Sequence, residues 1–315
     1  MILKYVFFLF FVSKIAAIDT EVFEFDLLWY ESNSTQPYLY KARSEITEGL
    51  RKSEKIQLNT SLESLSAVDL TFIPELKVLS LDNISLTYIK PGAFNNLPKT
   101  LQNLSITLNK IPQLDEGVFN NLTVRFLNLS HNQIRTIKSE AFDNMKDLTT
   151  IILDHNELSQ YDLKFAGCQK LNHISIKNNF IEQLPANLFA AVSDNVMMVE
   201  FSYNKLNKIH KLAFDIKEFK EVYLDHNELT DAVVLIKLVK ADKVNLSHNN
   251  INCLPKEFME NGLSKIKALN LIGNPLNCSC LHDLRKKVRK NIEFQKMSPL
   301  VKNINITLPE KDCVK

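Results

Sequence analysis

The sequence predicts an α/β repeat fold, a solenoid of about ten turns whose short strands form a parallel sheet on the concave side. The first observation is a pattern of apolar residues, seen in the segment LNLSHNQIRTI, that recurs every 22 to 25 residues. The second is an asparagine three residues beyond the third apolar place in eight copies. The third is that one copy cannot cover its own apolar face, so neighbouring copies must stack. The third apolar places are Leu58, Leu81, Ile106, Leu129, Leu153, Ile176, Phe201, Leu224, Leu246 and Leu271. The asparagines are Asn109, Asn132, Asn156, Asn179, Asn204, Asn227, Asn249 and Asn274.

The repeated unit, LxxLxLxxNxL, resembles the leucine-rich repeat family of extracellular type. The resemblance covers Ser53 to Asn277, with departures at the asparagine place in the first two copies, where Ser61 and Ile84 stand. It implies a horseshoe in which each inward asparagine hydrogen-bonds backbone groups of neighbouring turns that burial would otherwise leave unpaired. An aromatic stripe is expected to fill the core beneath the convex side: Phe94, Phe119, Phe142, Phe165 and Phe214.

The chain begins with a predicted signal peptide, residues 1–17. Lys4 supplies a positive start, Tyr5 to Val12 is apolar, and Ile15-Ala16-Ala17 suits the cleavage site. Later stretches are too short to span a bilayer, and the sequence shows no hydrophobic tail for a lipid anchor. We therefore expect a mature protein that is free in an extracellular fluid.

Residues 18–52 are predicted to form a cap over the first turn of the solenoid. Apolar residues alternate from Glu21 to Tyr30, which indicates a strand. A polar turn from Glu31 to Pro37 leads to a second apolar stretch, Tyr38 to Tyr40. We expect a hairpin here, because the terminal turns of a solenoid need a cover. The repeats then occupy residues 53–277.

The remaining segment, residues 278–315, is predicted to be a disulfide-bonded cap, since the motif NPLNCSC resembles the opening of the C-terminal cysteine cap of such proteins. Cys253 and Cys278 hold equivalent places in adjacent copies, which would stack about 5 Å apart. This favours the pairs Cys253–Cys278 and Cys280–Cys313, and the alternative is that Cys278 pairs with Cys313. The fifth cysteine, Cys168, is expected to be a buried free thiol.

A basic helix is expected after the last pair of neighbouring cysteines. Leu281, Leu284 and Val288 recur at helical spacing, while Arg285, Lys286, Lys287, Arg289 and Lys290 face outward or flank that stripe. A solvated cap helix is the favoured interpretation. The alternative is a local basic site for anionic glycans or membranes.

Nothing in the sequence predicts catalysis or a cofactor. There is no HExxH, GxSxG or paired CxxC motif, glycine is scarce, and a net charge of +2 gives no general attraction to nucleic acid. Four histidines precede a ladder asparagine: His131, His155, His226 and His248. Such a column could bind metal or sense pH, but a simple solvated position is favoured, because a metal site needs several ligands that converge on one point.

Extracellular placement agrees with nine Asn-x-Ser/Thr sequons. Eight are predicted glycosylation sites: Asn33, Asn59, Asn83, Asn103, Asn121, Asn128, Asn245 and Asn305. The ninth, Asn277, is set aside because a cysteine follows it. Several sequons lie on the first four strands and one on the ninth, so glycans there would leave strands five to eight open.

The predicted binding face is therefore the concave surface from Thr150 to His226, where large apolar and amphipathic residues stand at outward positions. Scattered exposed apolar side chains are the alternative interpretation. The candidate partner-binding residues are Ile152, Asp154, His173, Lys177, Met198, Glu200, Tyr203, Glu221, Tyr223 and Asp225.

We expect a secreted glycoprotein without enzymatic activity that binds another protein or a microbial ligand. Among leucine-rich repeat proteins the chain looks most like the short soluble immune proteins of insects, a resemblance that implies a role in innate immune recognition. The alternative function is an extracellular matrix or cell-surface ligand in adhesion or signalling. The sequence leaves the oligomeric state and the partner open.

Overall fold

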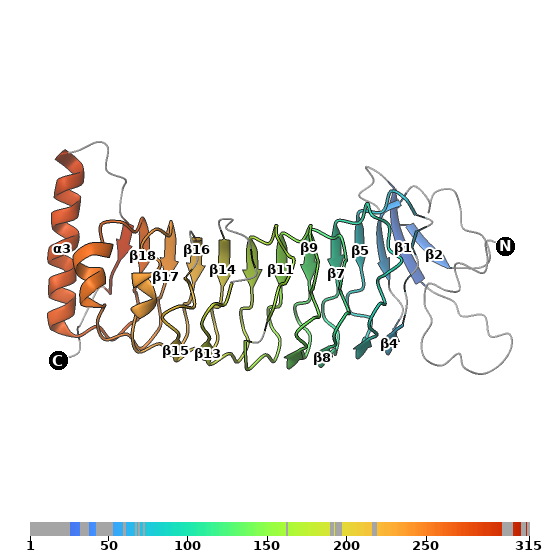
Figure 1. Cartoon of the computed structure of the whole chain (residues 1–315), viewed down its shortest axis with the longest axis horizontal. Coiled ribbons are helices and arrows are strands. Elements are labelled where there is room, and N and C mark those ends of the chain that lie inside the picture. Colours follow the sequence, from blue (N-terminus) through green and yellow to red (C-terminus); the bar gives the residue numbers. More distant parts are fainter. Residues whose placement is uncertain are drawn as a thin grey trace. The chain divides into compact units, whose positions relative to one another are not determined.

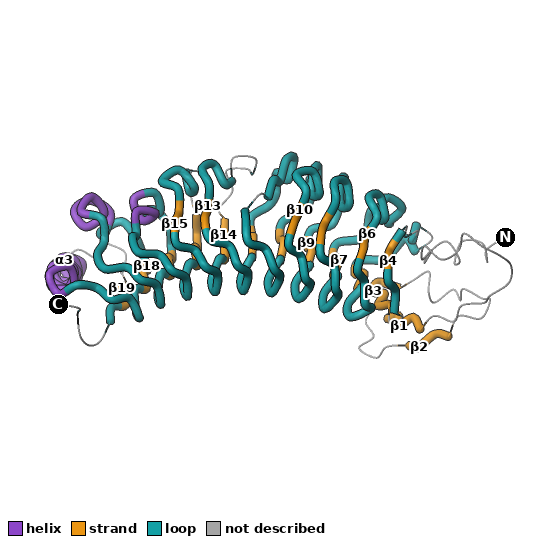
Figure 2. Tube along the Cα trace, turned by 90° about the horizontal axis from the view of Figure 1, so that it is seen from below, coloured by secondary structure: helices purple, strands orange, loops and turns teal. Residues whose placement is uncertain are grey.

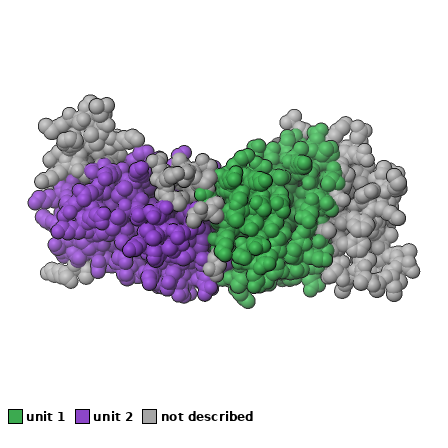
Figure 3. Space-filling view, in the orientation of Figure 1, with its two compact units in different colours: residues 1–157, 162–171, 191–193 green, residues 158–161, 172–190, 194–315 purple. Residues whose placement is uncertain are grey.

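The computed structural model describes residues 26–31, 38–41, 53–58, 61–66, 68, 70–71, 73–161, 163–189, 192, 197–215, 219–297, 305–309 and 313. The predicted signal peptide and the first part of the predicted strand at Glu21 to Tyr30 lie outside these residues. The chain divides into two compact units (Figure 3). Unit 1 comprises residues 1–157, 162–171 and 191–193, and unit 2 comprises residues 158–161, 172–190 and 194–315.

Unit 1 is a stack of coils that begins with the predicted hairpin. β1 (Asp26–Glu31) pairs antiparallel with both β2 (Tyr38–Lys41) and β3 (Ser53–Leu58), so the hairpin extends the sheet at the first coil. From β3 onward the strands are parallel, with one strand for each coil. They are β5 (Val78–Ser80), β7 (Asn103–Ser105), β9 (Phe126–Asn128) and β11 (Thr150–Ile152). Two-residue strands pair elsewhere on the coils: β4 (Ser64–Leu65) with β6 (Tyr88–Ile89), and β8 (Gln113–Leu114) with β10 (Thr136–Ile137).

Unit 2 repeats the same coil with a second set of parallel strands, which lie side by side in Figure 1. They are β12 (His173–Ser175), β14 (Met197–Glu200), β16 (Phe219–Tyr223), β17 (Lys243–Asn245), β18 (Ala268–Asn270) and β19 (Asn305–Thr307). β13 (Gln183–Leu184) and β15 (Lys208–Ile209) pair on a different side of the coils (Figure 2). The helices of this unit are the 3₁₀ turn η1 (Val233–Ile236), the π turn η2 (Phe258–Gly262) and α3 (Cys278–Met297).

The fold predicted from the repeat, a leucine-rich-repeat solenoid with a parallel sheet, is confirmed. Ten coils place a strand where the pattern predicts one, and the third apolar side chain of every coil is fully buried. The eleventh strand of the parallel series, β19, was not predicted. It comes from the segment after α3 and pairs with β18.

The aromatic stripe fills the core as expected. In unit 1, Phe94, Phe119, Phe142 and Phe165 stack in series, with ring centroids 5.4, 5.7 and 5.8 Å apart. In unit 2, Phe214 packs against two further aromatic rings, Phe189 and Phe219. Within each unit the rings of successive coils thus cover one another, which a single coil could not achieve alone.

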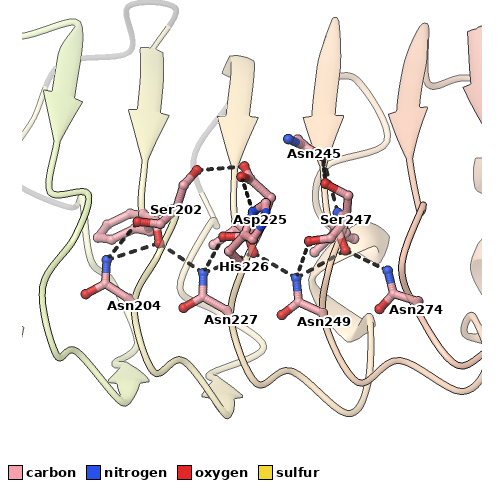
Figure 4. A network of polar contacts seen from close by, with 12 residues as sticks. Ser202, Asn204, Asp225, His226, Asn227, Asn245, Ser247, Asn249 and Asn274 are labelled. Carbon is pink, nitrogen blue, oxygen red and sulfur yellow. Dashed lines mark hydrogen bonds and ion pairs between the residues drawn. The ribbon is translucent and has the colours of Figure 1, made fainter.

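The inward asparagines form the predicted ladder (Figure 4). Asn227 is representative: its Nδ2 donates to the carbonyl oxygens of Leu224 in its own coil and of Phe201 in the preceding coil, both at 3.0 Å. Its Oδ1 accepts the backbone N–H of Leu206 at 2.9 Å. One buried side chain therefore satisfies backbone groups on two coils, which burial would otherwise leave unpaired.

The residue before each ladder asparagine adopts a left-handed backbone. From His131 through His248 the φ angles at this place lie between 53° and 58°, and Gly273 has a φ of 74°. A left-handed residue turns the chain out of the strand, and Asn or Gly tolerates this better than most residues. The sequence places His131, His155, Asn178, Tyr203, His226 and His248 in this column.

The predicted disulfide pairing is wrong, and the alternative for Cys278 is the pair observed. The bridges are Cys253–Cys280 and Cys278–Cys313, with Cα–Cα distances of 5.5 and 4.7 Å. The prediction assumed that Cys278 continues the coil, but α3 begins there. Asn277 caps the helix by accepting the backbone N–H of Cys280 at 2.8 Å. The first helical turn then brings Cys280, not Cys278, against the coil that carries Cys253.

Cys168 is a free and fully buried thiol, as expected. Its Sγ donates to the carbonyl oxygen of Phe142 at 3.2 Å. Burial raises the pKa of this thiol to about 11, so it carries its proton at neutral pH.

Candidate functional site

The structure distributes the predicted binding residues over both units. Ile152 and Asp154 belong to unit 1, where Ile152 is half-buried and Asp154 is buried. The other eight belong to unit 2 and stand on β12, β14 and β16 or in the turns that follow these strands. We call the outward side chains of these three strands the unit 2 strand face: His173, Met198, Glu200, Glu221 and Tyr223.

Glu200 is the centre of the first cluster on this face. Its Oε1 lies 2.9 Å from Nε2 of His173, and its Oε2 accepts from Nζ of Lys177 at 2.9 Å. The hydrogen bond from His173, followed by that from Lys177, lowers the pKa of Glu200. The two predicted charges Lys177 and Glu200 are therefore partners of each other on adjacent coils.

Tyr223 is the centre of a second cluster. Its hydroxyl donates to the carboxylate of Glu221, and Nζ of Lys243 donates to the same hydroxyl at 3.0 Å. The Lys243 ammonium also lies 4.8 Å from the centroid of the Tyr223 ring, a cation–π contact. Burial and the bond to Glu221 raise the pKa of the Tyr223 hydroxyl. Lys243 was not among the predicted contacts, although it stands directly beside Glu221 in the strand register.

Tyr203 belongs to a third arrangement, a column of stacked rings in the turns that leave the strands. Its ring centroid lies 4.1 Å from that of His226, and the His226 centroid lies 4.4 Å from that of His248. Asp225 fixes this column: its carboxylate accepts from Ser202 at 2.6 Å and contacts Nδ1 of His226 at 3.0 Å. Asp225, expected as an outward contact, is instead buried and acts as a support.

The most exposed apolar side chains of unit 2 lie in these turns and not on the strands. Among its described residues, the large apolar side chains that remain exposed are Phe180, Tyr203 and Ile272, at 45%, 50% and 38%. Phe180 lies beneath the ammonium of Lys205, 5.0 Å from the ring centroid. Phe180 and Ile272 were not among the predicted contacts: Phe180 follows the ladder residue Asn179, and Ile272 lies beyond His226, where the predicted face ends.

The histidine column is a set of stacked rings. Besides the rings of unit 2, His131 and His155 stack in unit 1 with centroids 4.2 Å apart. Parallel rings do not converge on one point, as a metal ion requires. Within the described part of the chain, no group of three or more His, Cys, Asp or Glu side chains is placed to hold a metal ion.

The sequons differ in their surroundings. Asn83, Asn103 and Asn121 are exposed, whereas Asn128 and Asn245 are half-buried. Asn128 accepts the backbone N–H of Ser130 through Oδ1, which leaves its Nδ2 for a glycan. Asn305 lies in β19, and Asn33 and Asn59 lie outside the described residues. Glycosylation at these positions remains a prediction.

No helix in the described residues is both long enough and apolar enough to cross a membrane.

Comparison with known proteins identifies similar repeats. The family described as "Leucine rich repeat" matches residues 74–134 and 99–158. Podocan-like protein 1 of Homo sapiens is 28% identical over 207 residues, which cover 62% of this chain and 39% of that protein. Lumican of Coturnix japonica is 26% identical over 232 residues (70% and 65%), and keratocan of Gallus gallus is 30% identical over 162 residues (49% and 44%). The chain thus spans less than two thirds of the length of each of these relatives.

A solved structure, described as "Crystal Structure of APL1 leucine-rich repeat domain", aligns with a TM-score of 0.42 and 16% identity. The alignment covers 73% of this chain and 82% of that one. The matched repeats, the stacked coils and the asparagine ladder together make this chain a leucine-rich-repeat solenoid.

Proposed function

We propose that this chain is a secreted, non-enzymatic glycoprotein of the extracellular matrix or cell surface that holds a protein partner on the unit 2 strand face and the turns beside it. One observation carries the proposal. Tyr203 is half exposed, and its ring stacks on that of His226, which Asp225 contacts at Nδ1 while its carboxylate accepts from Ser202. An exposed aromatic ring that is supported by stacking is a favourable centre for a protein interface.

Side chains that are ordered before binding increase affinity. A side chain that is fixed only on binding costs about 0.5–1.5 kcal/mol. On this face Glu200 holds His173 and Lys177, and Lys243 holds Tyr223, before any partner arrives. Binding of a partner would therefore cost less side-chain conformational entropy, and the free energy of binding would be more favourable.

The distribution of sequons supports the same face. In unit 2 they stand on β17 and β19, at Asn245 and Asn305, and at Asn277. β12, β14 and β16 carry none. Glycans on β17 and β19 would leave β12, β14 and β16 accessible to a protein.

The relatives favour a matrix or cell-surface role over an immune one. Lumican and keratocan are extracellular matrix small leucine-rich proteoglycans. The expected role in innate immune recognition and the expected microbial ligand gain no support from these relatives, and both stay predictions.

The experiment places a glycan on the face itself. His173→Asn creates an Asn-Ile-Ser sequon on β12, and Glu200→Asn creates an Asn-Phe-Ser sequon on β14. Each variant, expressed with a secretory leader, is used to capture partners from the native extracellular fluid, which are identified by mass spectrometry. We expect the protein enriched by the unmodified chain to fall by about tenfold or more with either variant, because the glycan excludes it.

Two controls distinguish the effect of a glycan on the strand face from the effect of losing the side chain and from the effect of a glycan elsewhere in unit 2. Glu200→Gln removes the carboxylate without adding a glycan, and Glu228→Asn adds an Asn-Leu-Thr sequon at an exposed place in the same unit beyond the strand face. We expect Glu228→Asn to retain capture. Replacement of both Tyr203 and Tyr223 by aspartate should abolish it. Undiminished capture by the glycosylated His173→Asn and Glu200→Asn chains would contradict the proposal.

A further inference from the structure

α3 concentrates the positive charge of the chain. This helix carries six basic side chains (Arg285, Lys286, Lys287, Arg289, Lys290 and Lys296) and two acidic ones (Asp283 and Glu293), a formal charge of +4. The whole chain carries +2, so the other 295 residues together carry −2. A basic helix on an otherwise slightly acidic chain creates a local field that the net charge hides.

The structure holds the helix firmly. Cys280 joins its first turn to the coil of Cys253, and Cys278 joins it to Cys313 in the segment after β19. Arg285 donates from Nη2 to the carbonyl oxygen of Pro309 at 3.1 Å. α3 lies at the end of unit 2 (Figure 1), and these bonds tie it there before a ligand binds.

The two sides of the helix differ sharply. Leu281 and Leu284 are buried, whereas His282, Asp283, Arg285 and Lys286 are exposed and Lys287 is half-buried. Arg285 and Lys286 thus face the solvent, and with Lys287 they outnumber the one exposed acidic side chain there, Asp283. The positive end of the helix dipole lies at this end of α3 and adds to the field.

The burial of one side of α3 bears on whether its basic side binds a lipid membrane or a hydrophilic polyanion. A helix that binds a membrane inserts an apolar face between the lipids while its basic residues contact the headgroups. In the described first turns of α3, the apolar side chains Leu281 and Leu284 are already buried in the fold. A hydrophilic polyanion needs only the exposed charges. Among extracellular polyanions, a sulfated glycan offers a line of strong acids along a flexible chain.

We propose that the exposed side of α3 is a binding site for sulfated glycosaminoglycan, with Arg285, Lys286 and Lys287 as its described contacts. The site lies on a different element from the strand face, so the chain would bind a glycan and a protein partner through separate surfaces. Binding is electrostatic and weakens as salt rises.

The test measures binding of a heparin octasaccharide to the full secreted chain at several salt concentrations. The variant Lys286→Gln/Lys287→Gln removes two charges and leaves the Arg285 contact and the buried leucines intact. We expect it to bind roughly tenfold more weakly at physiological salt and to show a shallower dependence on salt. The variant Lys211→Gln/Lys256→Gln loses the same charge at exposed places of unit 2 outside α3, and it should change affinity by less than about twofold.

Three results would overturn the inference: no binding of the octasaccharide at physiological salt, equal weakening by the two double variants, or equal retention on vesicles rich in phosphatidylserine. An unchanged circular dichroism spectrum and melting temperature show that each variant is folded. Loss of the glycan-binding inference can be told apart from loss of the proposed function, because the two use different variants and different ligands. The glycan-bearing Glu200→Asn chain should still bind heparin, and Lys286→Gln/Lys287→Gln should still capture the protein partner.

Discussion

At the scale of single residues, the left-handed column explains why certain side chains stand where they do. Gly273 is the last member, with a φ of 74°, and a Cβ there would lie 2.5 Å from Nδ1 of His248. Gly273→Ala is expected to cost at least about 1–2 kcal/mol, because a left-handed L-residue is strained and His248 must leave its stack on His226. Chemical denaturation measures the loss.

A matched variant separates the two causes. Gly273→Ala combined with His248→Asn removes the collision, and Asn tolerates the left-handed conformation, as Asn178 does at the same place. We expect the double variant to recover part of the stability lost by Gly273→Ala. Equal stability of Gly273→Ala and the unmodified chain would contradict the expected strain.

Glu200 gives the strand face a defined dependence on pH. Its pKa lies below the ordinary value of 4.5 because His173 and Lys177 hold its charged form. A lowered pKa adds stability that is present above the ordinary value and is lost as pH falls through the folded-state pKa. The melting temperature of Glu200→Gln should therefore lie below that of the unmodified chain near neutral pH, with a difference that shrinks below about pH 4.5. A difference that is constant from neutral pH to strong acid would be the contrary result.

At the scale of elements, the two bridges anchor α3 and the segment that supplies β19. They close loops of 27 and 35 residues, which corresponds to roughly 3–4 kcal/mol each in the chain-entropy account. Replacing either observed pair by serine, as C253S/C280S or C278S/C313S, should lower the melting temperature and leave the other bridge intact. The mismatched variant C253S/C278S should leave Cys280 and Cys313 without their partners.

Thiol alkylation followed by intact mass distinguishes these variants. Cys168 is the internal reference: burial raises its pKa to about 11, so it should react only after unfolding. The two matched variants should each yield one reactive thiol on unfolding without reductant, and the mismatched variant three. The reverse pattern, with C253S/C278S yielding a single thiol, would restore the pairing expected from equivalent places in adjacent copies.

The sequence predicts the parts of the fold that recur in every coil, and it does not predict the parts that occur only once. The apolar places and ladder asparagines recur because every coil must solve the same burial problem, so all ten strands could be located in advance. The disulfides and β19 lie where the repeat ends, and position within a copy is no guide once α3 replaces the coil. At the site, Tyr203 and Tyr223 were predicted, but Asp225 and Glu200 turned out to be held by neighbours. Alternation shows which side chains face outward, whereas their contacts depend on rotamers and on the adjacent coil.

At the scale of the whole molecule, a solenoid has two ends that its repeats cannot cover. Unit 1 begins with the β1–β2 hairpin, and unit 2 ends with α3 and β19. Leu281 and Leu284 of α3 are buried. These two side chains alone correspond to about 3–6 kcal/mol of apolar burial. Removing residues 278–315 should therefore expose the apolar side of the last coil and favour aggregation.

Two variants distinguish the effect of losing residues 278–315 from the effect of losing the Cys253–Cys280 bridge alone. The first chain ends at Asn277 and carries Cys253→Ser, so that the loss of Cys280 leaves no unpaired thiol at residue 253. The second is full-length C253S/C280S, which lacks the same bridge but keeps α3. Sedimentation velocity and binding of a hydrophobic dye should show association and exposed apolar surface in the truncated chain and a monomer-like state, with little dye bound, in the full-length variant. If both chains associate and bind the dye, loss of the Cys253–Cys280 bridge alone is enough to open this end of the solenoid, and if neither does, the expected cover is contradicted. If only the truncated chain associates, residues 278–315, which supply both β19 and the buried Leu281 and Leu284 of α3, cover the core at this end, with or without the Cys253–Cys280 bridge.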